Sequence, residues 1–346
     1  MAQRHIYIDE GPGEARGVIT LGRRPERLLS YRPAQDYPQL GVRYRARVVK
    51  VEKSAGLALL DLGSGLTAAL RIKPDRPPPV EGQAVEVEIA IEPQGDKDAV
   101  VRVIGLSSGQ PGRLSDPASL ETRLTGLAPD ARIIRGPEAR AVADQAEEEA
   151  LGIEHPLPGG GSIAVETTRA LTAVDVDLGA GGGGDAKRAA RQANLAAIAE
   201  LARLLRLKAL GGLVVIDLVG RGHDGQALSH AAQTAFAPEQ PGVIIGPITK
   251  FGTLELALPR RFRPVRDGLC DAAGHLLLDT LGLRLARAME REGRADPGGR
   301  IIARCAPAVA MAAQPYISVL METLGARFEV VADAAQAREA VQVSVR

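Results

Sequence analysis

The sequence is poor in aromatic residues and in cysteine. It has no tryptophan, 3% aromatic residues in all, and two cysteines, Cys270 and Cys305, among 346 residues. The cysteines form no CxxC pair, which argues against a disulfide framework and against a structural zinc site. No apolar run approaches the length of a membrane span, and the N-terminus has no signal-peptide hydrophobic segment. These absences predict a cytoplasmic protein that has no membrane partner.

The chain also lacks a strong excess of charge of either sign. The formal net charge is +1, so any surface that binds a polyanion must be local and cannot come from a global field. Hydrophobic residues make up 45% of the chain. At this length the chain has room for two or three domains and a sizeable core.

Residues 162–219 form the most informative stretch of the sequence. They read as two apolar strands, a glycine-rich loop, a long basic helix and a third apolar strand, with Asp175, Asp177 and Asp217 at the strand ends. Carboxylates in such apolar runs are costly to bury unless they are paired or hold a cation. A crossover helix makes the strands it joins parallel neighbours, which brings Asp175 and Asp217 to one sheet edge. The pattern predicts an Mg²⁺ site; the alternative is that these acids cap helices or pair with arginines.

The helix of this stretch is predicted from its apolar stripe, and the Gly211-Gly212 pair closes it. The stripe consists of Leu195, Ile198, Ala202 and Leu205. Asp185 is the expected N-cap. The following GLVVIDLV segment is so uniformly apolar that we expect a central strand covered on both faces. The glycine-rich loop lacks the spacing of a phosphate-binding loop and is interpreted as a connector.

Three blocks in this order resemble the catalytic region of the ribonuclease E/G family: ALTAVDVDLG, RQANLAAIAELARLLRLKALGGLVVIDLV and ITKFGTLELALPR. The resemblance implies a DNase-I-like fold in this region. It also implies that Asp175 and Asp217 are the catalytic, magnesium-binding aspartates. The family's neighbouring asparagine ligand falls on Asp177, so an acid replaces an amide there. Arg169, Asn194 and Glu255 lie at positions similar to the family's, where we expect supporting roles at most.

A barrel of the OB type is predicted over residues 39–105, where about five strands alternate with glycine-rich turns. It resembles the barrel inserted near the start of the family's proteins. In the family two exposed aromatic residues on this barrel stack RNA bases, and their positions fall on Leu59 and Ala69. We therefore expect this barrel to hold RNA weakly or through other residues.

The whole chain is predicted to be a multidomain α/β (α+β) protein: a DNase-I-like core with an inserted OB-type barrel and a small C-terminal α/β domain. The expected regions are N-terminal strands packed on the core (1–38), the barrel (39–105), a reduced sensor-like or linker region (106–158), the catalytic region (159–265) and the C-terminal domain (266–346).

Two family features are incomplete in this chain. The arginine of the Arg-Thr pair that senses a 5′-monophosphate falls on Arg135, but glycine follows it. The stretch of sequence between Arg135 and Asp175 is also too short to contain most of the RNase-H-like and sensor portion of the family's proteins. Of the zinc-binding cysteine motif that links two subunits in the family, Cys270 alone remains. We therefore expect no 5′-end sensing and no zinc-bridged dimer.

One dense basic cluster follows the catalytic blocks. It contains Arg260, Arg261, Arg263 and Arg266, with Lys250 and Phe251 upstream. Such clusters are often only solvated surface, but a phosphodiester substrate requires neutralisation of its backbone. The residues predicted to contact RNA are Lys250, Phe251, Arg260, Arg261 and Arg135. The five histidines show no metal-ligand spacing and no support for serine–histidine catalysis.

The function that the resemblance implies is Mg²⁺-dependent endonucleolytic hydrolysis of single-stranded RNA, with 5′-phosphate and 3′-hydroxyl products, in RNA processing. The first alternative is an RNA-binding protein of the same fold that has lost efficient cleavage. The substituted barrel positions favour it, whereas retained acids facing phosphates disfavour it. The second alternative is a metal-dependent phosphoesterase that acts on another substrate.

Overall fold

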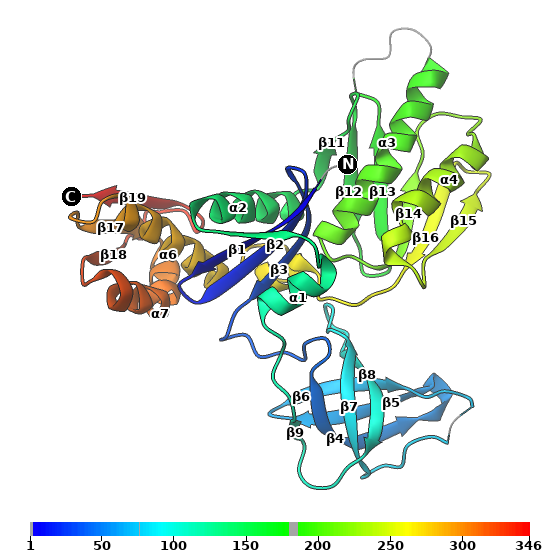
Figure 1. Ribbon diagram of the computed structural model, residues 1–346, viewed down its shortest axis with the longest axis horizontal. Helices are drawn as coiled ribbons and strands as arrows, with labels where there is room; N and C mark the ends of the chain where they lie inside the picture. The colour runs from blue at the N-terminus through cyan, green and yellow to red at the C-terminus, as the bar shows by residue number, and fades with distance from the viewer. Residues whose placement is uncertain (1–2, 76, 180–185) are drawn as a thin grey trace.

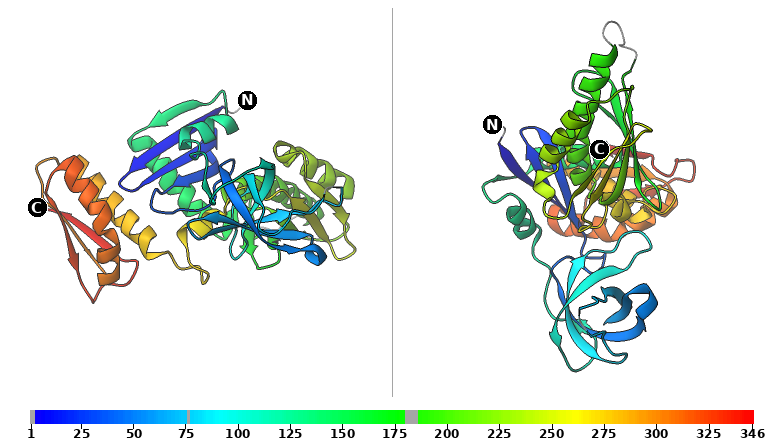
Figure 2. Two further views of the ribbon diagram at one scale, coloured as in Figure 1. Left: turned by 90° about the horizontal axis from the view of Figure 1, so that it is seen from below. Right: turned by 90° about the vertical axis from the view of Figure 1, so that its right-hand side faces the viewer.

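The computed structural model describes residues 3–75, 77–179 and 186–346, which form four β-sheets and their covering helices (Figure 1). The large sheet and the barrel occupy opposite ends of one view, with the N-terminal sheet between them and the C-terminal unit to one side (Figures 1 and 2). Asp185, the predicted N-cap, lies outside the described residues. Among the described helices, none is both long and apolar enough to cross a membrane.

The N-terminal sheet joins segments that are distant in the sequence. Its strand order is β10-β1-β2-β3. The elements are β1 (Arg4–Gly11), β2 (Glu14–Leu21), β3 (Arg24–Tyr31), β10 (Arg132–Arg135), α1 (Leu120–Leu127) and α2 (Pro137–Leu151). Alternate residues of β1 face the two helices: Tyr7 packs with α2, and Ile6 and Ile8 pack with α1. Residues 1–38 and part of 106–158, which the sequence analysis treated separately, therefore share one sheet.

The second sheet is a closed five-stranded barrel, as the turn spacing predicted. Its ring order is β4-β5-β6-β8-β7, and β4 also pairs with β5 to close it. The strands are β4 (Arg43–Glu52), β5 (Leu57–Gly63), β6 (Leu66–Arg71), β7 (Ala84–Ile91) and β8 (Ala99–Leu106), with β9 (Gly112–Arg113) added at the edge of β4. Inward-facing alternate residues such as Val48, Leu60 and Val87 fill its interior. An OB-like barrel fits this arrangement.

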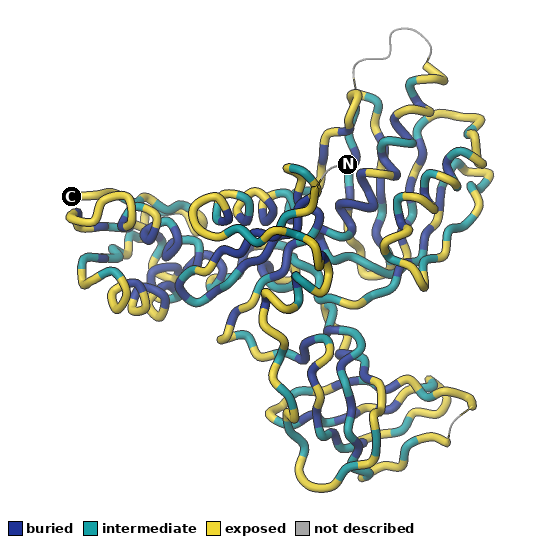
Figure 3. Tube along the Cα trace, in the orientation of Figure 1, coloured by how far each residue is buried: buried dark blue, intermediate teal, exposed yellow. Residues whose placement is uncertain are grey.

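The large sheet has the strand order β11-β12-β13-β14-β16-β15. The elements are β11 (Glu154–Pro156), β12 (Ser162–Thr167), β13 (Thr172–Asp177), α3 (Ala186–Leu207), β14 (Gly212–Asp217), α4 (Gly225–Ala235), β15 (Ile244–Ile248) and β16 (Thr253–Leu258). The predicted stripe of α3 packs on the sheet, with Ile198, Ala202 and Leu205 buried and Leu195 partly buried. Figure 3 shows the buried positions along α3 and the strands.

The expectation that β14 is covered on both faces is wrong. The strand is central, but Val214 and Ile216 are buried while Leu213 is 43% exposed and Asp217 is exposed. The buried pair faces α3 and α4, and the other face of the sheet is open. A prediction from hydropathy alone fails here. A strand whose open face carries apolar residues shows the same continuous apolar run as a strand covered on both faces.

The C-terminal unit follows α5 (Val265–Leu269) and has a three-stranded sheet of order β18-β17-β19. Its elements are α6 (Leu278–Ala295), β17 (Ile301–Cys305), α7 (Pro307–Leu324), β18 (Phe328–Ala332) and β19 (Val341–Val345). The predicted helix–strand–helix–strand series is present, and β19 is an additional antiparallel strand. Both cysteines are buried and free.

A buried network of ion pairs joins the N-terminal sheet to α2 and α6. Arg16 of β2 lies at its centre, with its guanidinium 2.6 Å from Asp9 and from Asp144 and 3.3 Å from Glu147. Arg140 extends the network from α2 to Glu290 of α6. These charges hold the three elements in one arrangement, since a buried charge is stable only while it is paired.

Candidate active site

Asp175 and Asp217 face the same side of the large sheet. The parallel pairing of β13 with β14 makes the two residues direct register partners. Neighbouring strands lie about 4.8 Å apart, and register partners project from the same face. Both residues are exposed. The crossover through α3 thus places the two carboxylates side by side, as the sequence predicted, and they lie on the open face, which it did not predict.

The local sequence explains why the acids point away from the core. Val174, Val176, Val214 and Ile216 alternate with them and are buried under the helices. A strand exposes every second side chain to each face, so burial of the valines and isoleucine fixes the acids on the opposite side. The same alternation excludes the interpretation that Asp217 is buried within an apolar run.

The surroundings of the pair leave room for a ligand. The next residues in the same row across the sheet are Ala164, beside Asp175, and Thr253, beside Asp217. Both are small side chains. Within the described part of the chain, neither carboxylate takes part in a hydrogen bond or an ion pair. Two free oxygen-donor groups on adjacent strands suit Mg²⁺, which needs only one or two carboxylates besides water and phosphate.

Asp177 lies on the same strand, two positions beyond Asp175, where its register partner is Ser162 of β12. Its carboxylate accepts a hydrogen bond from the backbone N–H of Gly179 at 3.0 Å. No group of three or more His, Cys, Asp or Glu side chains able to hold a metal occurs in residues 3–75, 77–179 and 186–346. Asp177 therefore faces the same side of the sheet as Asp175 and is bonded to its own turn, and its role as a metal ligand stays a prediction.

Asn194 fixes the chain just beyond Asp217. This residue of α3 is 1% exposed, and its amide donates to the carbonyl of Val219 at 2.9 Å and accepts from the Val219 N–H at 3.1 Å. The two bonds join the middle of the crossover helix to the end of β14. Because a buried amide is costly unless it is satisfied, Asn194 holds the carboxyl end of the strand in place.

The turn that precedes β16 lies at the same end of the sheet. Leu218 donates its N–H to the carbonyl of Gly252 at 3.2 Å, which places the turn next to Asp217. Phe251 is 80% exposed, and the Nζ atom of Lys250 lies 5.1 Å from the centroid of its ring. The hydroxyls of Thr249 and Thr253 lie 2.7 Å apart. These two threonines were not predicted from the sequence. Their spacing across the turn is the one sequence feature that could have indicated them.

Comparison with known proteins bears on this region of the chain. A model of the Ribonuclease E/G family matches residues 138–261, which contain both acids, Asn194 and the turn before β16. Over these residues the chain is similar to the Ribonuclease E/G family.

The similar curated proteins are ribonucleases E. The protein from Haemophilus influenzae is 39% identical over 159 residues, which are 42% of this chain and 17% of that protein. The Escherichia coli protein is 39% identical over 116 residues, or 33% of this chain and 11% of that protein. The matched part of the chain thus spans less than a fifth of the length of either relative.

The basic residues predicted to contact RNA do not all gather at the acids. Lys250 and Phe251 lie at the acid end of the sheet, whereas Arg260 follows the far end of β16, where Leu258 pairs with Gly212. Arg261 is exposed at that far end, and its carbonyl accepts the N–H of Glu92 from the barrel domain. The cluster is therefore divided between the two ends of the sheet.

Arg135 lies on the N-terminal sheet and not on the large sheet. Its guanidinium is 2.5 Å from Glu121 and 3.4 Å from Glu10. Both contacts are exposed surface ion pairs. The structure therefore does not bring this member of the family's sensor pair to the acids.

The barrel positions that correspond to stacking aromatics in the family are adjacent in space. Leu59 of β5 and Ala69 of β6 are direct register partners on the outside of the barrel, and Leu59 is 37% exposed. The surface is present, but its side chains have no π-face. Cys270 is buried beside the turn 271–275, where the Asp271 carboxylate accepts the N–H groups of Ala273 and His275.

Proposed function

We propose that the chain is an endoribonuclease that hydrolyses single-stranded RNA with Mg²⁺ and leaves 5′-phosphate and 3′-hydroxyl ends, in RNA processing or decay. The match of residues 138–261 to the family model and the similarity to ribonucleases E support the endoribonuclease role. The observation that carries the proposal is the register pair of exposed carboxylates, Asp175 and Asp217, which bond to no other residue that the structure describes. We also propose that the large sheet with α3 and α4 is the DNase-I-like core that the resemblance implies.

The residues present have separate roles in this proposal. Asp175 and Asp217 would hold the magnesium ion, which would supply an activated water and a counter-charge to the phosphate. Asn194 keeps the end of β14 rigid beneath the pair through its bonds to Val219. Lys250 places positive charge beside the exposed ring of Phe251, where an RNA strand with unstacked bases can lie.

An assay with end-labelled single-stranded RNA tests the proposal. We expect purified protein to cut the RNA in Mg²⁺, to stop when the metal is chelated, and to resume when Mg²⁺ is restored. Product ends should accept ligation that requires a 5′-phosphate. Binding of RNA without cutting under every metal condition would instead support the second candidate, a binding protein of this fold.

One observation favours that second candidate. The barrel offers Leu59 and Ala69 where the family has stacking rings, so part of the family's grip on substrate is absent. A family relative with a weaker barrel contact would need another surface that binds the RNA strand.

Phe251 is a candidate for that surface. It is the most exposed aromatic ring in the described chain, at 80%, and it lies beside the acids.

The contribution of this ring can be measured directly. Phe251→Ala is expected to raise the dissociation constant for single-stranded RNA about tenfold, since stacking of one base contributes roughly 1–3 kcal/mol. Fluorescence anisotropy in an Asp217→Asn background measures binding without cleavage. Met311→Ala is the matched control, because Met311 of α7 has a similar exposure of 74%. An equal loss of RNA affinity in both variants would show that Phe251 does not contact the RNA.

A further inference from the structure

A pocket lies at the edge of the large sheet opposite the acids. It occupies about 500 Å³ between the barrel loop 94–97, the end of α2, the hairpin 167–172 and the segment 260–267. The N-terminal ends of β13 and β14 border it, whereas Asp175 and Asp217 lie toward their C-terminal ends. The pocket is therefore separate from the candidate active site.

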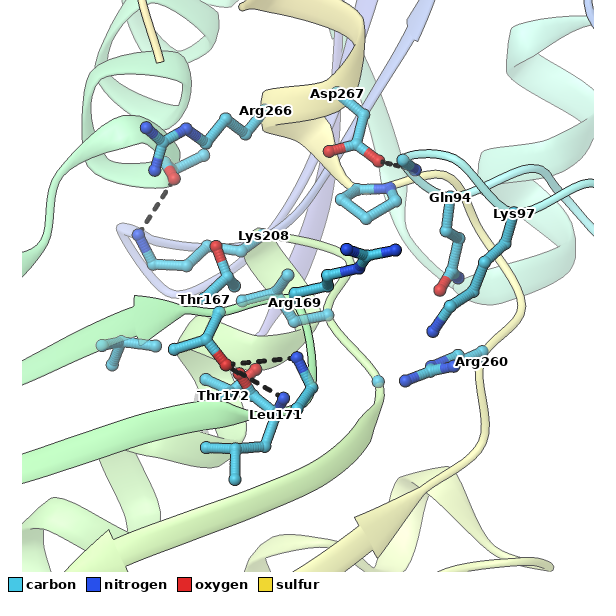
Figure 4. A pocket seen from close by; sticks show the side chains of 18 of the residues that line it. Gln94, Lys97, Thr167, Arg169, Leu171, Thr172, Lys208, Arg260, Arg266 and Asp267 are labelled. Carbon is cyan, nitrogen blue, oxygen red and sulfur yellow. Dashed lines mark hydrogen bonds between the residues drawn. The ribbon is translucent and has the colours of Figure 1, made fainter. Parts of the chain in front are cut away.

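Three cationic side chains extend into this space from three segments. Figure 4 shows Lys97 of the barrel, Arg169 of the hairpin and Arg260 pointing toward one another. None of the three takes part in a hydrogen bond or ion pair with another residue that the structure describes. Like charges that converge without a counter-ion repel each other, so the arrangement favours an anion between them.

The pocket lining carries more cationic than anionic side chains. Two carboxylates, Asp96 and Asp267, line it against five cationic side chains. The Oδ2 atom of Asp267 accepts the N–H of Gly95 at 2.8 Å, and Gln94 donates to the carbonyl of Phe262 at 3.0 Å. These two hydrogen bonds attach the barrel loop 94–97 to the segment 260–267, and they fix the backbone that carries Lys97.

Two glycines leave space for the side chain of Arg260. Gly212 has φ of +94°, and a Cβ there would come within 2.5 Å of the Arg260 guanidinium. At Gly211 a Cβ would lie 2.6 Å from the carbonyl oxygen of Pro259. The glycine pair therefore lets the arginine lie across the start of β14.

The remaining wall combines buried charge with apolar surface. Lys208 donates to the carbonyls of Glu149 and Ala150 at 3.2 and 2.9 Å, and burial lowers its pKa to about 8. It is held by the end of α2, so it contributes positive potential and not a free donor. Leu171 and Leu210 add apolar side chains to the lining.

We propose that this pocket binds a phosphorylated nucleotide, with the phosphate held by Arg169, Arg260 and Lys97. Guanidinium groups match phosphate oxygens in pairs, and an ammonium adds a point charge. The volume lies within the range of small-molecule sites, and the leucines provide an apolar surface for the sugar and base. The proposal does not depend on the nuclease activity, because it uses neither acid.

Calorimetric titration of the full chain with adenosine 5′-monophosphate tests the site. Arg169→Ala and Arg260→Ala are each expected to weaken binding about tenfold or more, as loss of a hydrogen bond to a charged group does. Arg132→Ala, which removes an exposed arginine of β10, should leave binding unchanged. Adenosine, which lacks the phosphate, should bind far more weakly than the nucleotide.

Competition distinguishes a free nucleotide from a nucleotide of an RNA strand. If a single-stranded oligonucleotide displaces the monophosphate from Asp217→Asn protein, the site holds part of a strand; if both bind together, it holds a free nucleotide. Equal affinity for adenosine and its monophosphate, no binding of either, or unchanged binding by both arginine variants would overturn the proposal. Loss of cleavage in Asp175→Asn with nucleotide binding retained would leave it intact.

Discussion

Asp217→Asn and Asp175→Asn should each lower the rate of Mg²⁺-dependent RNA cleavage by about three orders of magnitude. Each amide keeps the shape of the side chain but removes one of the two negative charges that face each other across β13 and β14. A bound metal contributes several kcal/mol to the transition state, and about 4 kcal/mol corresponds to a thousandfold change in rate. Single-turnover cleavage of labelled RNA measures the effect.

The double variant and two neighbouring acids make this prediction specific. Asp175→Asn/Asp217→Asn should be no slower than either single variant, because residues that act as a unit are not additive. Two neighbouring acids provide controls. Glu255, changed in Glu255→Gln, lies on the same face in the row next to that of Asp217, and Asp177→Asn changes a carboxylate bonded to Gly179. Both should cut within severalfold of the parent rate. RNA binding should survive in all the variants; cleavage by Asp217→Asn at the parent rate would exclude the metal-site proposal.

The crossover unit was predictable because its signals are local. Acids at the ends of apolar strands, a helix with an apolar stripe and a handedness rule for the connection together specify that Asp175 and Asp217 are neighbours. The barrel was predictable for a similar reason, since short alternating strands with glycine-rich turns have few ways to close.

Other features depend on contacts between distant residues, which one sequence does not reveal. The pairing of β1 with β10 joins His5 to Arg132 across the whole barrel insertion. The pocket likewise requires the barrel loop to meet the hairpin of the large sheet, so nothing near Lys97 in the sequence indicates Arg169. The open face of β14 was hidden because Leu213 and Val215 have the hydropathy of a covered strand.

The buried ion-pair network is the clearest case of such a hidden feature, and it carries the largest expected effect on stability. Arg16 is 2% exposed and contacts Asp9 and Glu147, which are also buried. Arg16→Met should lower the free energy of unfolding by about 3–5 kcal/mol, because it leaves buried carboxylates without a partner. Urea denaturation followed by circular dichroism measures the change.

An exposed pair provides the control. Arg300→Ala breaks the contact of Arg300 with Glu329, whose side chains are 66% and 42% exposed, and should cost no more than about 1 kcal/mol. If Arg16→Met were as stable as Arg300→Ala, the network would be dispensable for the fold.

The effect of Arg16 should also depend on pH. Burial by itself would raise the pKa of Asp9, but the charge and hydrogen bond of Arg16, with the charges of Arg140 and Arg287, hold it below its ordinary value of 3.8. A lowered pKa in the folded state stabilises the protein above 3.8, and this contribution is lost as the pH falls through the folded-state pKa. The difference between the parent and Arg16→Met should therefore be largest near neutral pH and narrow in acid. A constant difference over that range would mean that Arg16 stabilises the protein through packing, because loss of packing alone does not follow the titration of Asp9.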